Sequence, residues 1–107
     1  MTHDYEAQRL GTYETFALIA KDQGLPAHAM VAFQFAAEDV EPNWSAAEKA
    51  LTGAGFRPRR DAAEGILEAV AGPMALTADE VWRWEKQATD AVLKWDFWPD
   101  GWEVLQP

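Results

Sequence analysis

The sequence predicts an α+β fold, in which an N-terminal helix precedes a β-α-β-β-α-β core with an antiparallel four-stranded sheet. Two observations predict this class. Segments with apolar residues at helical spacing alternate, in that order, with apolar segments of strand length. Sequences of the form S/T-x-x-E, starting at Ser45 and Thr77, mark the starts of the two core helices. We expect a single domain over residues 1–107, with the N-terminal helix in residues 1–24 and the ferredoxin-like core in residues 28–105.

The first two predicted elements are a helix and a buried strand. Apolar side chains recur at helical spacing from Tyr5 to Lys21, and the pattern stops before Gly24-Leu25-Pro26. Gly11 lies inside this segment and is expected to interrupt the helix or delay its start. From His28 to Ala36 every second residue, beginning with Ala29, is apolar, which is typical of a strand.

The middle of the chain predicts a short helix and two strands. The capping box at Ser45 opens the helix, which ends near Gly53 and Gly55. Residues 56–60 form a brief strand containing Pro58, and proline belongs on a sheet edge because it donates no ladder hydrogen bond. The apolar strand over residues 66–71 is expected to stop at Gly72-Pro73.

The last two predicted elements complete the fold. A helix capped at Thr77 should run to about Leu93, and a final strand over residues 96–105 should bend at Pro99-Asp100-Gly101. In a ferredoxin-like sheet the first and third strands are central. Those are the two most apolar strands here, and Pro58 lies in a strand that must be an edge.

Composition excludes several classes of function. The 107 residues include 18 acidic and 9 basic residues, so the net charge of −9 disfavours direct nucleic-acid binding and favours a basic partner. There is no cysteine, so disulfides and thiolate sites are excluded. We expect a cytoplasmic protein without a secretory leader or membrane segment, because the N-terminus is polar and acidic and no apolar run is long enough. The chain is expected to be a monomer or a homodimer.

The inventory of catalytic and metal-binding groups is thin. His3 lies near the terminus and His28 begins a strand, and neither belongs to a recognisable catalytic motif with a nucleophile and an acid. The carboxylates of residues 38–41 lack the glycine-turn spacing of a calcium loop. We therefore expect no catalytic residue, no metal and no cofactor, and a protein that is not an enzyme.

Five of the six tryptophans lie between Trp82 and Trp102. On a helix, Trp84 and Trp95 share one face with the small apolar residues, which predicts core positions for both. Trp82 projects away from that face. Trp82, Trp98 and Trp102 are therefore the tryptophan candidates for partner contact.

Arg57, Arg59 and Arg60 form the one basic cluster, on the predicted edge strand. They are candidates for contact with an acidic partner segment. The alternative is that they pair with nearby carboxylates of this chain and protect the sheet edge from aggregation. The outer face of the sheet also needs an explanation, because the core helices cover only one face. We expect the N-terminal helix to cover it, with a second subunit or a partner as the alternatives.

Several segments resemble the family of regulators of ribonuclease activity B, the RraB-like domain. They are RLGTYETFALIAKDQGLPAHAMVAFQF, the acidic break EDV, the helix SAAEKALTGAG followed by Phe56, and ILEAVAGPMALTADEVWRWEKQA. The most specific element is Asp100-Gly101-Trp102 within residues 94–102, whereas Pro99 stands where the family commonly has an aromatic residue. The similarity spans about residues 9–105. It implies the ferredoxin-like fold and a protein that binds ribonuclease E and inhibits it.

Two classes of function follow. The first is a non-enzymatic regulator that binds a protein partner, such as a ribonuclease or an RNA-processing assembly, or, in a close variant, an immunity-type inhibitor that caps a basic toxin. The second is a small ferredoxin-like ligand-binding domain or enzyme with a pocket between sheet and helices. We favour the regulator.

Overall fold

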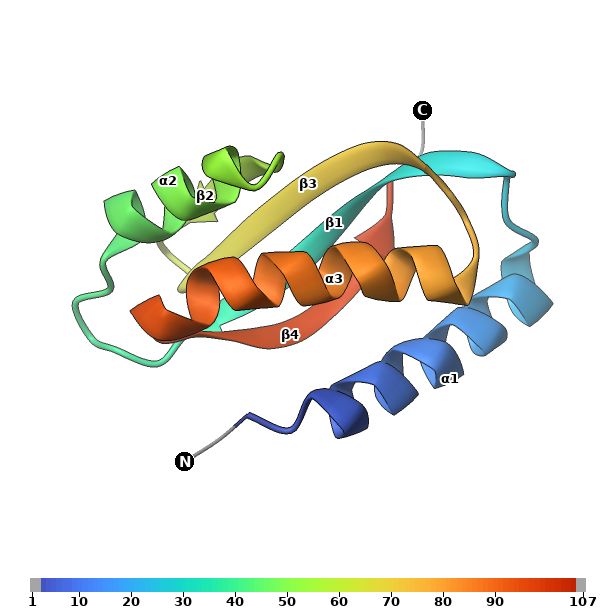
Figure 1. The fold of residues 1–107 in the computed structure, drawn as a ribbon, viewed down its shortest axis with the longest axis horizontal. Helices are drawn as coiled ribbons and strands as arrows, with labels where there is room; N and C mark the ends of the chain where they lie inside the picture. Colours follow the sequence, from blue (N-terminus) through green and yellow to red (C-terminus); the bar gives the residue numbers. More distant parts are fainter. Residues whose placement is uncertain (1–2, 106–107) are drawn as a thin grey trace.

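The protein has the predicted ferredoxin-like α+β arrangement (Figure 1). A computed structural model describes residues 3–105, so the outermost residues of the expected domain, 1–2 and 106–107, lie outside it. Three helices and four strands follow one another in the predicted order. The elements are α1 (Tyr5–Gln23), β1 (His28–Ala37), α2 (Trp44–Gly53), β2 (Arg57–Asp61), β3 (Ile66–Ala75), α3 (Ala78–Val92), the 3-10 helix η1 (Leu93–Trp95) and β4 (Phe97–Val104).

The sheet has the strand order β2-β3-β1-β4 with antiparallel neighbours. The apolar strands β1 and β3 are central, and Pro58 lies in the edge strand β2, as predicted. β4 is bent by a register shift opposite Phe33 and Phe35, at the expected Pro-Asp-Gly segment. Proline and the exposed charges of β2 keep this edge from pairing with another sheet.

The core fills the space between the sheet and the helices α2 and α3. Phe33, Phe35 and Phe97 are its largest fully buried side chains. The Phe56 ring links the layers, because it meets the Phe33 ring edge-on at 6.4 Å and the Trp84 ring edge-on at 5.5 Å. Burial of these aromatic and aliphatic groups is the main favourable term in folding.

The helix starts were predicted with mixed success. Thr77 caps α3, because its hydroxyl accepts from the Glu80 N–H at 3.1 Å. The capping box at Ser45 was wrong: Asn43 caps α2 by accepting from the Ala46 N–H at 3.2 Å, and Ser45 lies in the first turn. Asparagine is as good an N-cap as serine, so the motif alone does not choose between them.

One boundary and one interruption also differ from expectation. β3 continues past Gly72 to Ala75, because Gly72 adopts a φ of 121° and its Cα sits so near β1 that a Cβ would lie 2.9 Å from the Ala29 carbonyl oxygen. Pairing with β1 resumes beyond this irregularity. The end of α3 agrees with expectation, because the helix stops at Val92, next to the expected Leu93, and η1 follows. α1, in contrast, runs through Gly11 without a break.

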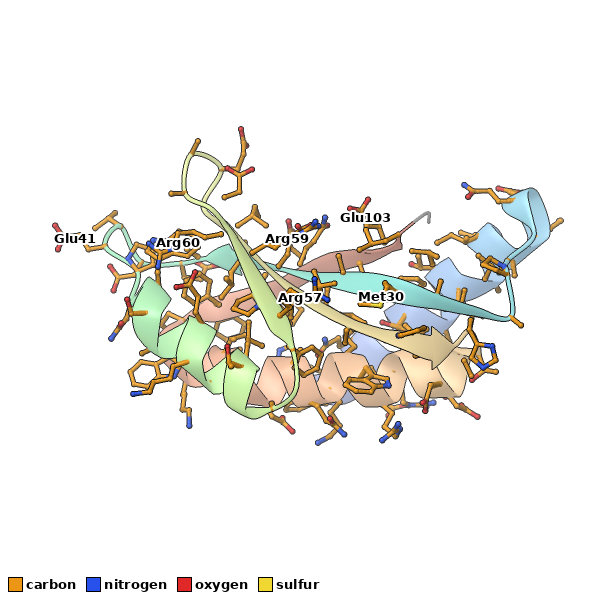
Figure 2. All side chains as sticks on the ribbon, turned by 90° about the horizontal axis from the view of Figure 1, so that it is seen from above. Met30, Glu41, Arg57, Arg59, Arg60 and Glu103 are labelled. Carbon is orange, nitrogen blue, oxygen red and sulfur yellow. The ribbon has the colours of Figure 1, made fainter. Side chains whose placement is uncertain are left out.

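The N-terminal helix does not cover the outer sheet face, so that expectation was wrong. α1 packs beside α3 and along the β4 edge, which leaves the face opposite α2 and α3 without a helix (Figures 1 and 2). Side-chain bonds between the two helices hold it there. Tyr5 Oη donates to Asp90 Oδ1 at 2.5 Å, and Tyr13 donates to Asp79. Burial and the neighbouring Asp90 carboxylate raise the pKa of Tyr5 to about 12.

Candidate interaction surface

The uncovered sheet face is built from residues that alternate with the core positions of each strand. Small apolar side chains lie in its middle: Ala32 is 0% and Val70 6% exposed. Charged side chains at the edges flank them, and Figure 2 shows Arg59 and Glu103 on the side away from α3. The centre of the face needs no covering helix, because its apolar groups there are small and long charged side chains border them. The larger Ile66 and Trp98 lie toward one end of the face and are half-buried. Its cross-strand rows are Arg57–Val70–Ala32–Glu103, Arg59–Glu68–Gln34 and Asp61–Ile66–Ala36–Trp98.

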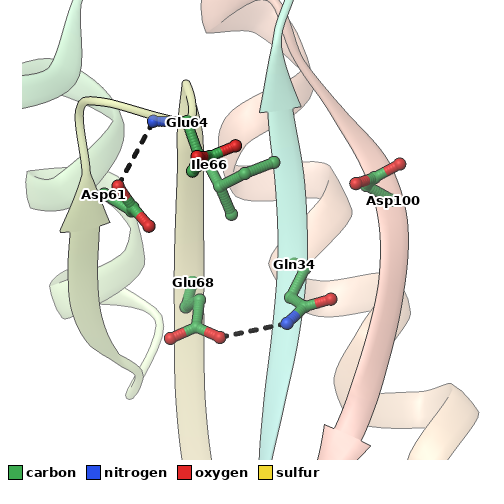
Figure 3. Close-up of a pocket in the computed structure, with 6 residues that line it drawn as sticks. All are labelled: Gln34, Asp61, Glu64, Ile66, Glu68 and Asp100. Carbon is green, nitrogen blue, oxygen red and sulfur yellow. Dashed lines mark hydrogen bonds between the residues drawn. The ribbon is translucent and has the colours of Figure 1, made fainter.

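A shallow hollow of about 370 Å³ lies on this face (Figure 3). Glu68 is fixed in it by Arg59 and by Gln34, whose Nε2 donates to Glu68 Oε2 at 3.2 Å. Asp61, Glu64 and Asp100 carry no ion pair within residues 3–105. The hollow is therefore a negatively charged depression that attracts a basic group. Its walls are Gln34, Asp61, Glu64, Ile66, Glu68 and Asp100.

The predicted basic cluster is divided between the two sides of the sheet. Arg59 lies on the uncovered face and contacts Glu68 at 2.6 Å (Nη2 to Oε1). Arg60 points to the helix side, where its guanidinium binds both carboxylate oxygens of Glu48 at 2.6 and 3.0 Å. These two arginines pair with carboxylates of the chain itself. All three arginines are exposed, but Arg57 alone among them makes no such pair in the described part of the chain.

The three candidate tryptophans do not form one surface. Trp102 is 9% exposed and belongs to the core, opposite Phe33, so the structure removes it from the contact candidates. The cause is the bend in β4, after which Trp102 points to the helix side. Trp98 is half-buried, and its ring meets the His3 ring edge-on at 5.8 Å. Trp82 is half-buried on α3, outside the core cluster.

Trp84 and Trp95 pack against the core, as predicted from their helical spacing. Neither residue is completely enclosed, yet both indole N–H groups are buried without a hydrogen-bond partner in the described chain. An unsatisfied N–H costs free energy, so these rings are held by their packing and not by polar contacts.

The chain matches no protein-family model, and no curated protein sequence matches it significantly. Within residues 3–105, no helix is long and apolar enough to cross a membrane. In the same range no group of three or more histidine, aspartate or glutamate side chains is placed to hold a metal ion.

Sequence reasoning missed the acidic hollow, although one signal pointed to it. Glu68 is a lone carboxylate inside the apolar strand β3, and Gln34 holds the matching position in β1. Charged or amide groups in the middle of central strands indicate a face that stays in contact with water. Asp61, Glu64 and Asp100 come from a hairpin and an edge strand, so only the sheet register brings them together.

Proposed function

We propose that the protein is an acidic, non-enzymatic regulator that binds a basic segment of a partner protein on its uncovered sheet face. The observation that carries this proposal is the face itself, which no helix covers and which holds the acidic hollow. Ribonuclease E, or an RNA-processing assembly that contains it, is the partner to test first, because of the resemblance described above. Binding would act by steric occlusion in the cytoplasm.

Charge complementarity supports a basic segment over other occupants. The chain carries a net charge of −9, and three carboxylates of the hollow form no ion pair in the described residues. Such a surface speeds encounter with a positive partner and repels nucleic acid. Arg57 and Arg59 lie at one edge of the face. They would orient a bound segment, because an acidic residue of that segment would lie beside them.

The test compares two triple variants with the same change in net charge. Asp61→Asn/Glu64→Gln/Asp100→Asn neutralises the hollow while keeping side-chain size. We expect it to weaken binding of the partner at least about tenfold, a loss of about 1.4 kcal/mol, measured by titration calorimetry at low salt. Raising the salt concentration should weaken the wild-type complex in the same direction.

The control variant is Glu14→Gln/Asp22→Asn/Glu41→Gln, which removes three exposed carboxylates away from the face. It should change the affinity by less than about threefold, because long-range attraction is screened by salt. The proposal is refuted if the two triple variants bind equally well. Failure of ribonuclease E to bind, with another basic protein recovered and bound through the hollow, would favour the immunity-type variant.

A further inference from the structure

A second hollow, of about 220 Å³, is lined by residues of α1, α3 and β4. These three elements lie side by side in Figure 1. Glu85 of α3 reaches it with a side chain that belongs to a residue only 4% exposed. Trp102 contributes to the β4 wall, and Gly11 and Thr12 contribute to the α1 wall. The hollow thus combines a buried carboxylate with an aromatic ring, on the opposite side of β4 from the acidic sheet face.

The Glu85 carboxylate has hydrogen bonds but no cation. Gln8 Nε2 donates to Oε2 at 3.0 Å, and the Thr12 hydroxyl donates to Oε1. An ionised carboxylate accepts about four hydrogen bonds, so capacity remains on both oxygens. No lysine or arginine pairs with Glu85 in the described residues, and His3 reaches it only through Gln8, at 2.7 Å from Gln8 Oε1. Burial raises the pKa of Glu85, which shows how poorly the site supports the bare charge.

Gly11 gives an independent reason to regard the hollow as a built feature. Glycine is a poor residue in a helix interior, yet α1 runs straight through this position. No close packing requires the glycine, because a Cβ there would meet nothing within 4 Å. Its missing side chain widens the hollow beside the buried carboxylate.

We propose that this hollow binds a small organic cation, a guanidinium or primary ammonium group, with Glu85 as its counter-ion and the Trp102 ring as its wall. A cation there would compensate the buried carboxylate and gain attraction from the aromatic face. The volume suits a group of a few heavy atoms and not a nucleotide or a lipid. The cation comes either from a free small molecule or from an arginine or lysine side chain.

The probes are methylguanidinium and methylammonium, and methylurea is the neutral control with the shape of methylguanidinium. We expect both cations to shift the indole N–H resonance of Trp102, assigned with Trp102→Phe, in a saturable way with a millimolar Kd. Methylurea should bind at least about tenfold more weakly. The tripeptide Gly-Arg-Gly distinguishes the sources, since tighter binding of the peptide than of methylguanidinium assigns the site to a protein side chain.

Glu85→Gln keeps the size of the side chain and should weaken binding of methylguanidinium at least about tenfold. Glu14→Gln removes the same charge from an exposed position and should leave the affinity unchanged. Gly11→Leu, which fills the hollow from α1, tests the site again if Glu85→Gln does not fold. Equal binding of methylurea, unchanged binding by both site variants, or no shift up to about 10 mM probe overturns the proposal.

The proposed partner site on the sheet face and the proposed cation site beside Glu85 can be tested independently of each other. The triple variant of the sheet face retains Glu85, Trp102 and Gly11, so it should bind methylguanidinium like the wild type. A protein that loses its macromolecular partner in that variant but keeps the cation has two independent sites. Loss of both in the same variant would show that the hollow beside Glu85 is not a separate site.

Discussion

Replacement of Gly11 by alanine should stabilise the protein, although glycine is the natural residue. Gly11 lies in the interior of α1 and is itself exposed, at the rim of the hollow beside Glu85. A Cβ at this position meets no atom within 4 Å, so the substitution introduces no clash. Alanine also restricts the unfolded chain more than glycine does, which favours the folded state.

The size of the effect follows from these facts. Glycine is less favourable than alanine by about 0.8–1.0 kcal/mol in a helix interior. Replacing glycine by alanine at a site with compatible backbone angles stabilises a protein by about 0.4–1 kcal/mol, because the unfolded chain loses conformational entropy. We expect the free energy of unfolding to rise by about 0.5–1 kcal/mol. For a domain of this size, that corresponds to a rise in Tm of about 2–6 °C.

Urea unfolding followed by circular dichroism measures the change directly. Gly65→Ala is the matched control: a Cβ there also meets nothing within 4 Å, but Gly65 has a φ of 68°, so alanine should destabilise by about 1 kcal/mol. A loss of stability in Gly11→Ala would refute the reasoning. An unchanged main transition with a separate early one would show that α1 unfolds apart from the core.

Two further predictions concern α3. Trp84→Ala should cost about 3–5 kcal/mol, because the ring packs against Phe56 and the core, whereas Trp82→Ala should leave the Tm within a few degrees. A large loss from Trp82→Ala would overturn the assignment of faces on α3. Burial raises the pKa of Glu85, so the native state holds that proton more tightly than the unfolded state, and stability falls as pH rises from below about 4.5 through the folded pKa. Glu85→Gln lacks this loss, so its stability relative to wild type should be higher at about pH 8 than at about pH 4 in urea titrations, and an equal difference at both pH values would contradict the assignment.

The order and pairing of the strands could be predicted because local chemistry decides them. Predominantly apolar character places β1 and β3 in the centre of the sheet, and Pro58 needs an edge. The position of α1 could not be predicted in this way. Its apolar residues point in two directions: Phe16 and Ile19 pack on the core, while Leu10 and Leu18 are 50% and 62% exposed. A helix without one apolar face gives no pattern from which to read its contact surface.

The residues available for partner contact were harder to predict than the position of α1. The register between distant strands decides which face of the sheet each of them occupies. Arg59 and Arg60 are adjacent in sequence, but a strand sends them to opposite faces, where Glu68 and Glu48 pair with them. Trp102 entered the core because β4 bends before it. Residues that are close in the sequence were therefore predicted to share one contact surface, but the fold places them on different sides of the sheet.

Hydrogen bonds between α1 and α3 explain why α1 does not cover the sheet face. Its inner side carries Gln8, Thr12 and Tyr5, whose partners Glu85, Thr89 and Asp90 all lie on α3. Moving α1 onto the sheet face would break these bonds, bury Asp61, Glu64 and Asp100 without cations, and leave Glu85 to solvent. The charges of the face thus keep the chain's own helix away, and the same charges form the surface that we propose for a basic segment. The contact that α1 makes instead encloses Glu85, so one choice of packing produces both the open acidic face and the buried carboxylate.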